Sequence, residues 1–426
     1  MSISFPGSKG AFTSVHTDSR EVKPGGLFFA LRGAATDGHH YLADAISRGA
    51  AGLVVERPPA DPGGAQVLVV PDAWAALYDL ARRHLEEVAP IVIGITGSNG
   101  KTTTKEMLAA ILATRFRVLK TEGNLNTETG LPLTILRLRP GDQVAVLEMG
   151  MQATGEIARL AALARPSIGI VTGIGTVHLE FFDSQEGIAR AKAELVAALP
   201  AEGLAVLNHD DPFTPLLAGG SRARVATFGL EGGDFHGEGY RAGSFTVGGV
   251  EVRMPTPGRH LARNALAAIA AADHLGVPVA EAAVALRSLS VERRLQSLPA
   301  PAVFTVVDDA YNASPESMLA AFEAVAELPR QGRLLAVLGE MRELGPAGEE
   351  WHRKVGAAVR EVFDAACVAD VGLGRVLAEA AGAALVADKP AAARWARGEA
   401  GPGDLVLVKA SHGVGLEDVV AELLRP

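Results

Sequence analysis

The sequence predicts an α/β protein of three domains whose sheets are mostly parallel. Short β-branched runs alternate with helical patterns along much of the chain, and this alternation is typical of parallel, doubly wound sheets. A chain of 426 residues is longer than a domain with a single hydrophobic core usually is, and a hydrophobic content of 48% is enough to form several cores. We therefore expect domains at residues 1–88, 89–296 and 297–426.

The stretch Ile91–Met107, IVIGITGSNGKTTTKEM, predicts a strand, a glycine-rich turn and a helix in direct succession. Backbone N–H groups of such a turn point inward, and the helix dipole adds about half a positive charge, so the turn can bind an anion. Lys101 can reach the outer phosphates of a nucleotide and the Thr102 hydroxyl can coordinate magnesium, as in a Walker A loop. The spacing of the glycines in this turn is shorter than in the standard Walker A pattern. The alternative is a turn whose Lys and Thr residues only cap the helix.

The first 88 residues predict a small α/β unit. After a turn-rich lead, a helix is expected over 41–50 and strands over 51–56 and 66–70, followed by a helix that begins near Asp72. Ser19 and the turn Thr36–Gly38 could bind a ligand, although such turns are usually structural.

Two polar residues of the central part lie where a sheet would present them to a ligand. Glu148 ends the predicted strand 143–150, and His178 follows the strand 167–171. Open α/β sheets bind ligands at the carboxyl ends of their strands, so Glu148 could hold magnesium. A solvated Glu and a hydrogen-bonded structural His are the alternatives. Lys192, in the predicted helix 184–195, has the composition of an ordinary helix-face lysine.

The amino-acid composition limits which partners and which cellular compartment we expect. The net charge of −9 gives no reason to expect nucleic acid or a membrane surface as the main partner. Cys367 is the one cysteine, so no intramolecular disulfide framework exists. We see no signal peptide and no apolar run of about 18 residues, and we expect a cytoplasmic protein without a membrane span.

Taken together, the motifs resemble the Mur ligase family of ATP-dependent amide-forming enzymes over nearly the whole chain. They are DSR…DGHHY, TGSNGKTTTKEM, NLNTETGLPLTIL, LEMGM, TVHLEFF…AKAEL, PGRH…NALAA, DDAYNASPESM, GEMRELG and VLVKASHG. Within the family, YNASPESM and GEMRELG are similar to the branch that adds D-alanyl-D-alanine, and the DNPR motif of the diaminopimelate- or lysine-adding relative is absent.

The resemblance implies a role for each domain. The first would bind the UDP end of UDP-N-acetylmuramoyl-tripeptide, the central P-loop domain would hold ATP and two Mg²⁺ ions, and the Rossmann-like last domain would bind the dipeptide and close. A monomer is expected. The residues implied in substrate binding are Ser19, Thr36, Asp37, Gly38, Asn126 and Thr127.

The same resemblance assigns the nucleotide and metal residues. The ATP-binding residues would be Gly97, Ser98, Asn99, Gly100, Lys101, Thr102, Thr103, Asn264, Arg294 and Asp309, with Arg293 and Asp308 as near alternatives to the last two. Thr102, Glu148, His178 and Lys192 would be metal ligands, and Lys101, Glu148, His178 and Lys192 would serve catalysis. Lys192 matches a lysine that the family carries carbamylated; carbamylation turns an ammonium, which cannot ligate magnesium, into an anionic oxygen donor. Two positions depart from the family pattern, Leu261 in place of an Asn and Gly26 in place of an Asp.

The implied reaction is amide formation through an acyl phosphate. Another Mur ligase, or a glutamate-adding folate ligase, is the nearest alternative enzyme, although the folate ligase should lack the front domain. A nucleotide-dependent regulatory protein is the alternative of a different class, and it would hydrolyse ATP without needing an amine.

Overall fold

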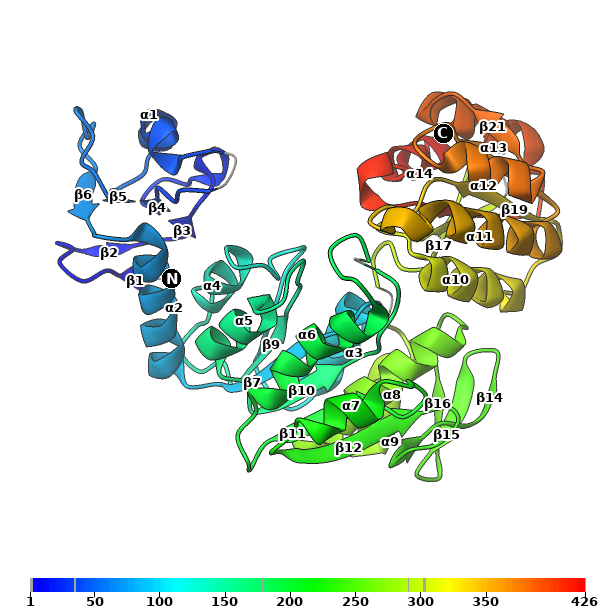
Figure 1. The fold of residues 1–426 in the computed structure, drawn as a ribbon, viewed down its shortest axis with the longest axis horizontal. Helices are drawn as coiled ribbons and strands as arrows, with labels where there is room; N and C mark the ends of the chain where they lie inside the picture. Colours follow the sequence, from blue (N-terminus) through cyan, green and yellow to red (C-terminus); the bar gives the residue numbers. More distant parts are fainter. Residues whose placement is uncertain (1–2, 34–35, 178, 290, 302–303, 426) are drawn as a thin grey trace. The chain divides into compact units, whose positions relative to one another are not determined.

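The computed structural model describes residues 3–33, 36–177, 179–289, 291–301 and 304–425 (Figure 1). The chain forms two compact units. The first unit comprises residues 1–94, 116–151 and 155–167, and the second comprises 95–115, 152–154 and 168–426. Strand β7 (Ile91–Thr96) begins in the first unit and ends in the second.

The N-terminal part of the first unit is built on a four-stranded parallel sheet in the order β3-β4-β5-β6. Its elements are β1 (Ile3–Ser4), β2 (Ala11–Phe12), β3 (Val15–His16), β4 (Leu27–Phe29), α1 (Leu42–Ser47), β5 (Gly52–Val55), β6 (Gln66–Val69) and α2 (Ala73–Val88). The expected helix over 41–50 is shorter than predicted. A 3-10 turn, Gly38–Tyr41, precedes α1 because the Asp37 carboxylate accepts a hydrogen bond from the His39 N–H and fixes a tight turn.

The rest of the first unit carries β7, β9 (Val144–Glu148) and β8 (Val118–Lys120), in that order. Helices α4 (Gly130–Ile135) and α5 (Glu156–Ala164) pack with α2 beside these strands. Strand β9 is buried throughout, as a strand between two neighbours in a parallel sheet should be. Its last residue is Glu148, so the predicted strand-end acid lies where expected on its own strand.

The second unit contains the parallel strands β10 (Ile168–Val171), β11 (Leu204–Asn208), β12 (Arg224–Gly229) and β13 (Phe235–His236). Its helices in this part are α3 (Lys101–Leu112), α6 (Gln185–Ala197), α7 (Thr214–Gly219), α8 (Arg259–His274) and α9 (Val279–Leu286). The alanine-rich helix α8 packs against α3, which follows the glycine-rich turn. Strands β14 (Glu238–Arg241), β15 (Ser244–Val247) and β16 (Val250–Arg253) form an antiparallel sheet.

The C-terminal part has a six-stranded sheet in the order β17-β18-β22-β19-β20-β21. Only β17 (Gln296–Pro299) runs antiparallel, against β18 (Thr305–Asp308), and the other pairs are parallel. The remaining elements are α10 (Pro315–Glu327), β19 (Leu334–Leu338), α11 (Gly348–Val362), β20 (Ala365–Ala369), α12 (Gly374–Ala381), β21 (Ala384–Val386), α13 (Lys389–Glu399), β22 (Leu405–Lys409) and α14 (Glu417–Leu423). None of the helices found in the described residues has the length and apolar character needed to cross a bilayer.

Candidate functional site

The turn between β7 and α3 can be made only with glycine at two positions. Gly97 has φ +147° and Gly100 has φ +84°, in the region that favours glycine. A methyl group on Gly97 would lie 1.8 Å from Thr172 Oγ1, and one on Gly100 would lie 2.4 Å from Asn264 Oδ1. The backbone of the turn is therefore held directly against the loop after β10 and against α8.

Hydrogen bonds fix the turn between these glycines. Ser98 N–H donates to the Gly173 carbonyl at 2.8 Å, and Thr172 Oγ1 donates to the Asn99 carbonyl at 2.5 Å. Helix α3 starts at Lys101, and its N-cap Gly100 makes no side-chain cap. The turn and the helix start therefore have the backbone arrangement from which the sequence predicts an anion site.

Lys101 lies over this turn. Its ammonium donates to the Gly97 carbonyl at 2.9 Å and to the Ser98 carbonyl at 3.4 Å. The positive charge is therefore placed at the turn itself, next to the helix N-terminus. Thr102 and Thr103 follow in the first turn of α3, with Thr103 buried.

Residues of the C-terminal part also reach the turn. Ser314 caps α10 and its hydroxyl donates to Asn99 Oδ1 at 3.1 Å. Glu316, two residues later, accepts at Oε1 from the Thr176 N–H at 2.8 Å. The YNASPESM segment that the sequence singled out thus contacts both the glycine-rich turn and the loop after β10.

Asp308 and Asp309, which the sequence left as alternatives, have different surroundings. Asp309 is buried and its Oδ2 accepts from the Lys409 ammonium at 2.6 Å, whereas Asp308 Oδ1 accepts from the Ala310 N–H at 3.0 Å. Burial raises the pKa of Asp308. Lys409, at the end of β22, also donates to the Asn312 carbonyl at 2.9 Å. Sequence reasoning missed Lys409, although its position at a strand end in VLVKASHG is a signal.

The arginine alternatives are also distinguished by their contacts. The Arg294 guanidinium stacks on the Tyr311 ring, 4.2 Å from its centroid, and Tyr311 lies in the same segment as Asp309. Arg293 has φ +55° and lies 3.7 Å from the neighbouring Glu292 carboxylate. The contact with Tyr311 brings Arg294 to this segment, and the charge of Arg293 acts on Asp308 in the same segment, where it tends to lower the pKa.

In the first unit, Glu148 is a buried carboxylate with a defined orientation. It is 2% exposed, and its Oε1 accepts from Asn126 Nδ2 at 2.8 Å. Thr127 lies next to Asn126, and its hydroxyl is 3.2 Å from that of Thr129. Carboxylate oxygens suit magnesium, and a fixed neighbour holds such a ligand in place, so Glu148 fits a metal-binding role.

Lys192 is buried in α6, with 2% of its surface exposed. Burial, and secondarily the charge of Lys101, lowers its pKa well below the ordinary value, so the neutral amine is favoured. His178 lies outside the described residues. Within the ranges that the structure describes, no group of three or more His, Cys, Asp or Glu side chains could hold a metal ion. Lys192 fits as a magnesium ligand only if carbon dioxide converts it to a carbamate.

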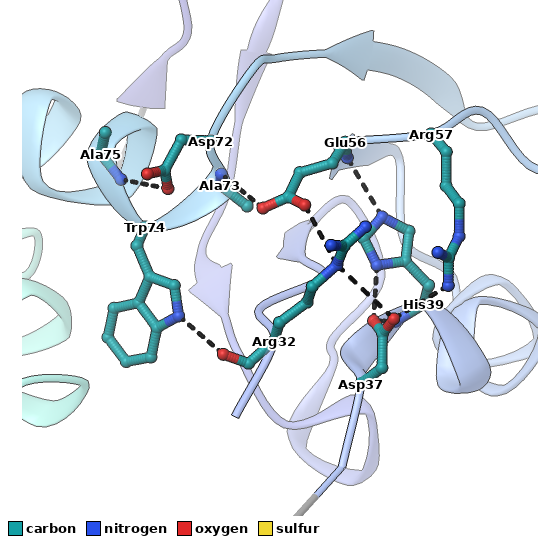
Figure 2. Close-up of polar contacts among 9 residues, drawn as sticks. All are labelled: Arg32, Asp37, His39, Glu56, Arg57, Asp72, Ala73, Trp74 and Ala75. Atoms are coloured by element: carbon teal, nitrogen blue, oxygen red, sulfur yellow. Dashed lines mark hydrogen bonds and ion pairs between the residues drawn. The ribbon is translucent and has the colours of Figure 1, made fainter. Parts of the chain in front are cut away.

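Asp37, one of the predicted residues of the first domain, lies in a polar cluster with Arg32, His39, Glu56 and Arg57 (Figure 2). Asp37 contacts three side chains: Oδ1 is 2.6 Å from His39 Nδ1, and Oδ2 is 2.8 Å from Arg57 and 3.7 Å from Arg32. His39 Nε2 accepts from the Glu56 N–H, so Nδ1 carries the proton. These contacts fix the turn Thr36–Gly38, which the sequence analysis considered as a ligand site.

The three remaining residues predicted in this domain have simple surroundings. The Thr36 hydroxyl is 3.0 Å from the Tyr41 hydroxyl, and a methyl group on Gly38 would meet the Leu31 nitrogen at 2.7 Å. Ser19 is buried, and its hydrogen bond is the main cause that lowers the pKa of Asp44.

The fold and the glycine-rich turn between β7 and α3 define a multidomain α/β protein, and the chain belongs to the Mur ligase family. The model described as "Mur ligase family, catalytic domain" matches residues 11–85, "Mur ligase middle domain" matches 95–272, and "Mur ligase, glutamate ligase domain" matches 293–412. The expected fold class, three domains with mostly parallel sheets, is confirmed.

Individual relatives make the likeness more specific. The chain is 37% identical to UDP-N-acetylmuramoyl-tripeptide–D-alanyl-D-alanine ligase of Bacillus subtilis, over 96% of this chain and 93% of the relative. It resembles the crystal structure of MurF from Acinetobacter baumannii with a TM-score of 0.88 and 31% identity, covering 98% and 94% of the two chains. MurF ligase from Thermotoga maritima, solved in complex with ADP, matches with a TM-score of 0.84 and 31% identity over 96% of each chain.

Proposed function

We propose that this chain is an ATP-dependent ligase that joins D-alanyl-D-alanine to UDP-N-acetylmuramoyl-tripeptide, an ADP-forming step of peptidoglycan synthesis. One observation carries the assignment of substrates: the likeness to the Bacillus subtilis ligase of that name extends over 96% of this chain and 93% of the relative. The geometry of the glycine-rich turn supports the nucleotide part, because its amides, the α3 N-terminus and Lys101 favour an anion.

The first step activates a carboxylate. The terminal carboxylate of the tripeptide attacks the γ-phosphorus of ATP, ADP leaves, and an acyl phosphate forms. A carboxylate alone is a poor electrophile, and phosphorylation gives it a leaving group. Two anions must approach each other, so the chain has to neutralise charge and align the groups. Lys101 and the amides of the turn are placed for this.

The second step forms the amide. The amine of D-alanyl-D-alanine attacks the acyl carbon, and inorganic phosphate leaves through a tetrahedral intermediate. We assign Asn264, Arg294 and Asp309 to the nucleotide, because Asn264 contacts Gly100 and Arg294 stacks within the segment of Asp309. We assign Ser19, Thr36, Asp37, Gly38, Asn126 and Thr127 to the UDP-tripeptide, an assignment that rests on the sequence resemblance.

Metal ligands complete the proposal. Thr102 and Glu148, with carbamylated Lys192 and His178, are the residues that would hold magnesium. When bound, magnesium supplies positive charge to phosphate oxygens. Glu148 contributes a buried carboxylate that Asn126 orients, and Lys192 contributes a buried amine whose lowered pKa favours the neutral form that reacts with carbon dioxide.

Phosphate release tests the reaction. We expect phosphate from ATP only when UDP-N-acetylmuramoyl-tripeptide and D-alanyl-D-alanine are both present, because the acyl phosphate is consumed by the amine. The assay is run across a panel of acceptors, with glutamate plus a folate as the comparison. Release with the folate pair would contradict the substrate assignment, and steady release without any amine would favour a regulatory ATPase.

Gly97→Ala tests the nucleotide loop. The added methyl group would lie 1.8 Å from Thr172 Oγ1, at a φ of +147°, so the turn must move. We expect affinity for ATP to fall by at least about tenfold, the equivalent of about 1.4 kcal/mol, as measured by titration with a fluorescent ATP analogue. Gly398→Ala is the matched control, since nothing lies within 4 Å of that position. Unchanged affinity in Gly97→Ala would place the nucleotide elsewhere.

A further inference from the structure

Three buried polar atoms without a partner gather where the glycine-rich turn, the loop after β10 and the start of α10 meet. Across the described ranges, five buried side-chain atoms have no hydrogen-bond partner: Ser98 Oγ, Thr104 Oγ1, Thr176 Oγ1, Glu316 Oε2 and Glu417 Oε2. Ser98 and Thr176 are 5% and 6% exposed. Buried polar atoms are normally paired, so a group of unpaired ones calls for an explanation.

Gly175 is the point around which Ser98, Thr176 and Glu316 lie. A methyl group on Gly175 would be 3.3 Å from Ser98 Cβ and 3.3 Å from Glu316 Cδ. The Thr176 N–H donates to Glu316 Oε1 at 2.8 Å, which leaves Oε2 as the carboxylate oxygen without a donor. Gly175 thus lies against the Ser98 and Glu316 side chains and directly before Thr176, so three segments that each carry an unpaired oxygen meet around it.

The chemistry of these atoms selects a ligand. All three can accept hydrogen bonds, and the carboxylate carries a negative charge, so a phosphate or a carboxylate would be repelled. A primary ammonium group carries a positive charge and three N–H donors and has no acceptor. Its three donors match the three acceptors, and shielding from water strengthens a charge-assisted hydrogen bond to Glu316.

We propose that Ser98, Thr176 and Glu316 bind the ammonium group of the incoming dipeptide. This inference rests on the proposed function, and it adds to it a place for the second substrate. Ser98 belongs to the same turn as Lys101, so an amine held here lies beside the proposed γ-phosphate position and hence beside the acyl phosphate. Because the three atoms are shielded from water, the dipeptide reaches them only when α10 separates from the two loops.

Glu316→Gln is the main test, in the phosphate-release assay. The substitution removes the charge and keeps an acceptor for the Thr176 N–H. We expect the KM for D-alanyl-D-alanine to rise at least about tenfold, as loss of a charged hydrogen bond implies. The KM values for ATP and for UDP-N-acetylmuramoyl-tripeptide should stay within about twofold. Glu323→Gln is the matched control, because it makes the same charge change on an exposed face of the same helix.

Inhibition by N-acetyl-D-alanyl-D-alanine separates recognition of the ammonium group from recognition of the rest of the dipeptide. This compound lacks the ammonium group, so we expect equal inhibition of the wild type and of Glu316→Gln. Thr176→Val is a second variant, which keeps the side-chain volume and removes one acceptor. It should raise the KM for the dipeptide alone, by less than Glu316→Gln does.

Three results would overturn the proposal. The first is an unchanged KM for the dipeptide in both variants. The second is an equal rise in the KM values for all three substrates, which would indicate a structural role. The third is a raised magnesium requirement with an unchanged KM for the dipeptide, which would assign the oxygens to a metal ion. A wild type that releases phosphate without any dipeptide would instead contradict the proposed function.

Discussion

Replacing Lys192 with Ala is expected to abolish ligation while the chain stays folded. The buried amine has its pKa lowered well below the ordinary value, chiefly by burial, so it is available in the neutral form that attacks carbon dioxide and releases a proton. The resulting carbamate would supply the negative oxygen that the reaction centre needs near the phosphates. Removing one electrostatic group of this kind typically lowers kcat by about 10²–10³-fold, and a lost metal adds to that.

Two measurements check this expectation. After equilibration with ¹³C-labelled bicarbonate, the wild type should show a carbamate carbon by NMR that Lys192→Ala lacks. Lys354→Ala, a substitution of an exposed lysine paired with Glu350, should keep both the signal and the activity. Added short carboxylic acids should restore part of the activity of Lys192→Ala. Full activity of that variant without such an acid would rule out the carbamate.

The segments with strong local signals were predictable from the sequence. The β-branched run and the glycines of Ile91–Met107 predicted a strand, a turn and a helix, and the structure has β7 at Ile91–Thr96 and α3 from Lys101. Ser184 caps α6, which starts at Gln185, one residue after the predicted start. These segments were predictable because propensity, capping and glycine position all favour the same local structure.

Contacts between distant segments were not predictable in the same way. Thr172 excludes any side chain at Gly97, and Asn264 does so at Gly100, across 75 and 164 residues. The sequence predicts strands within the turn-rich segment 225–254, but it does not predict the bounds or the antiparallel pairing of β14–β16, whose strands are only four residues long each. The spacing of apolar residues does not predict which short strands pair with each other when turns are as frequent as strands.

The choice between Asp308 and Asp309 shows the same limit. Two adjacent acids look alike in sequence, yet Asp308 is the last residue of β18 and Asp309 follows it, and the two carboxylates have different partners. Strand β22 pairs with β18 and delivers Lys409 to Asp309. The partner lies 100 residues away and becomes identifiable only once the sheet order is known.

Lys409→Met is expected to destabilise the C-terminal part by about 3–5 kcal/mol, because it leaves the buried Asp309 carboxylate without its partner. The pair is almost fully buried, with side chains 2% and 8% exposed, and the Asn312 carbonyl loses a donor as well. Urea unfolding followed by circular dichroism measures the change. Lys389→Met is the matched control: its pair with Asp418 is exposed and screened by water, so a much smaller change is expected.

The double variant Asp309→Asn with Lys409→Met separates stability from binding. Removing both charges should restore most of the stability lost in Lys409→Met, since the cost comes from one unpaired buried charge. The affinity of the double variant for ATP should be lower than that of the wild type, because the neutral amide introduced by Asp309→Asn cannot replace the carboxylate that we assign to the ribose. A double variant as unstable as Lys409→Met would mean that Lys409 stabilises the chain through Asn312 rather than through Asp309. Wild-type affinity for ATP in the double variant would remove Asp309 from the nucleotide site and leave the ion pair with a purely structural role.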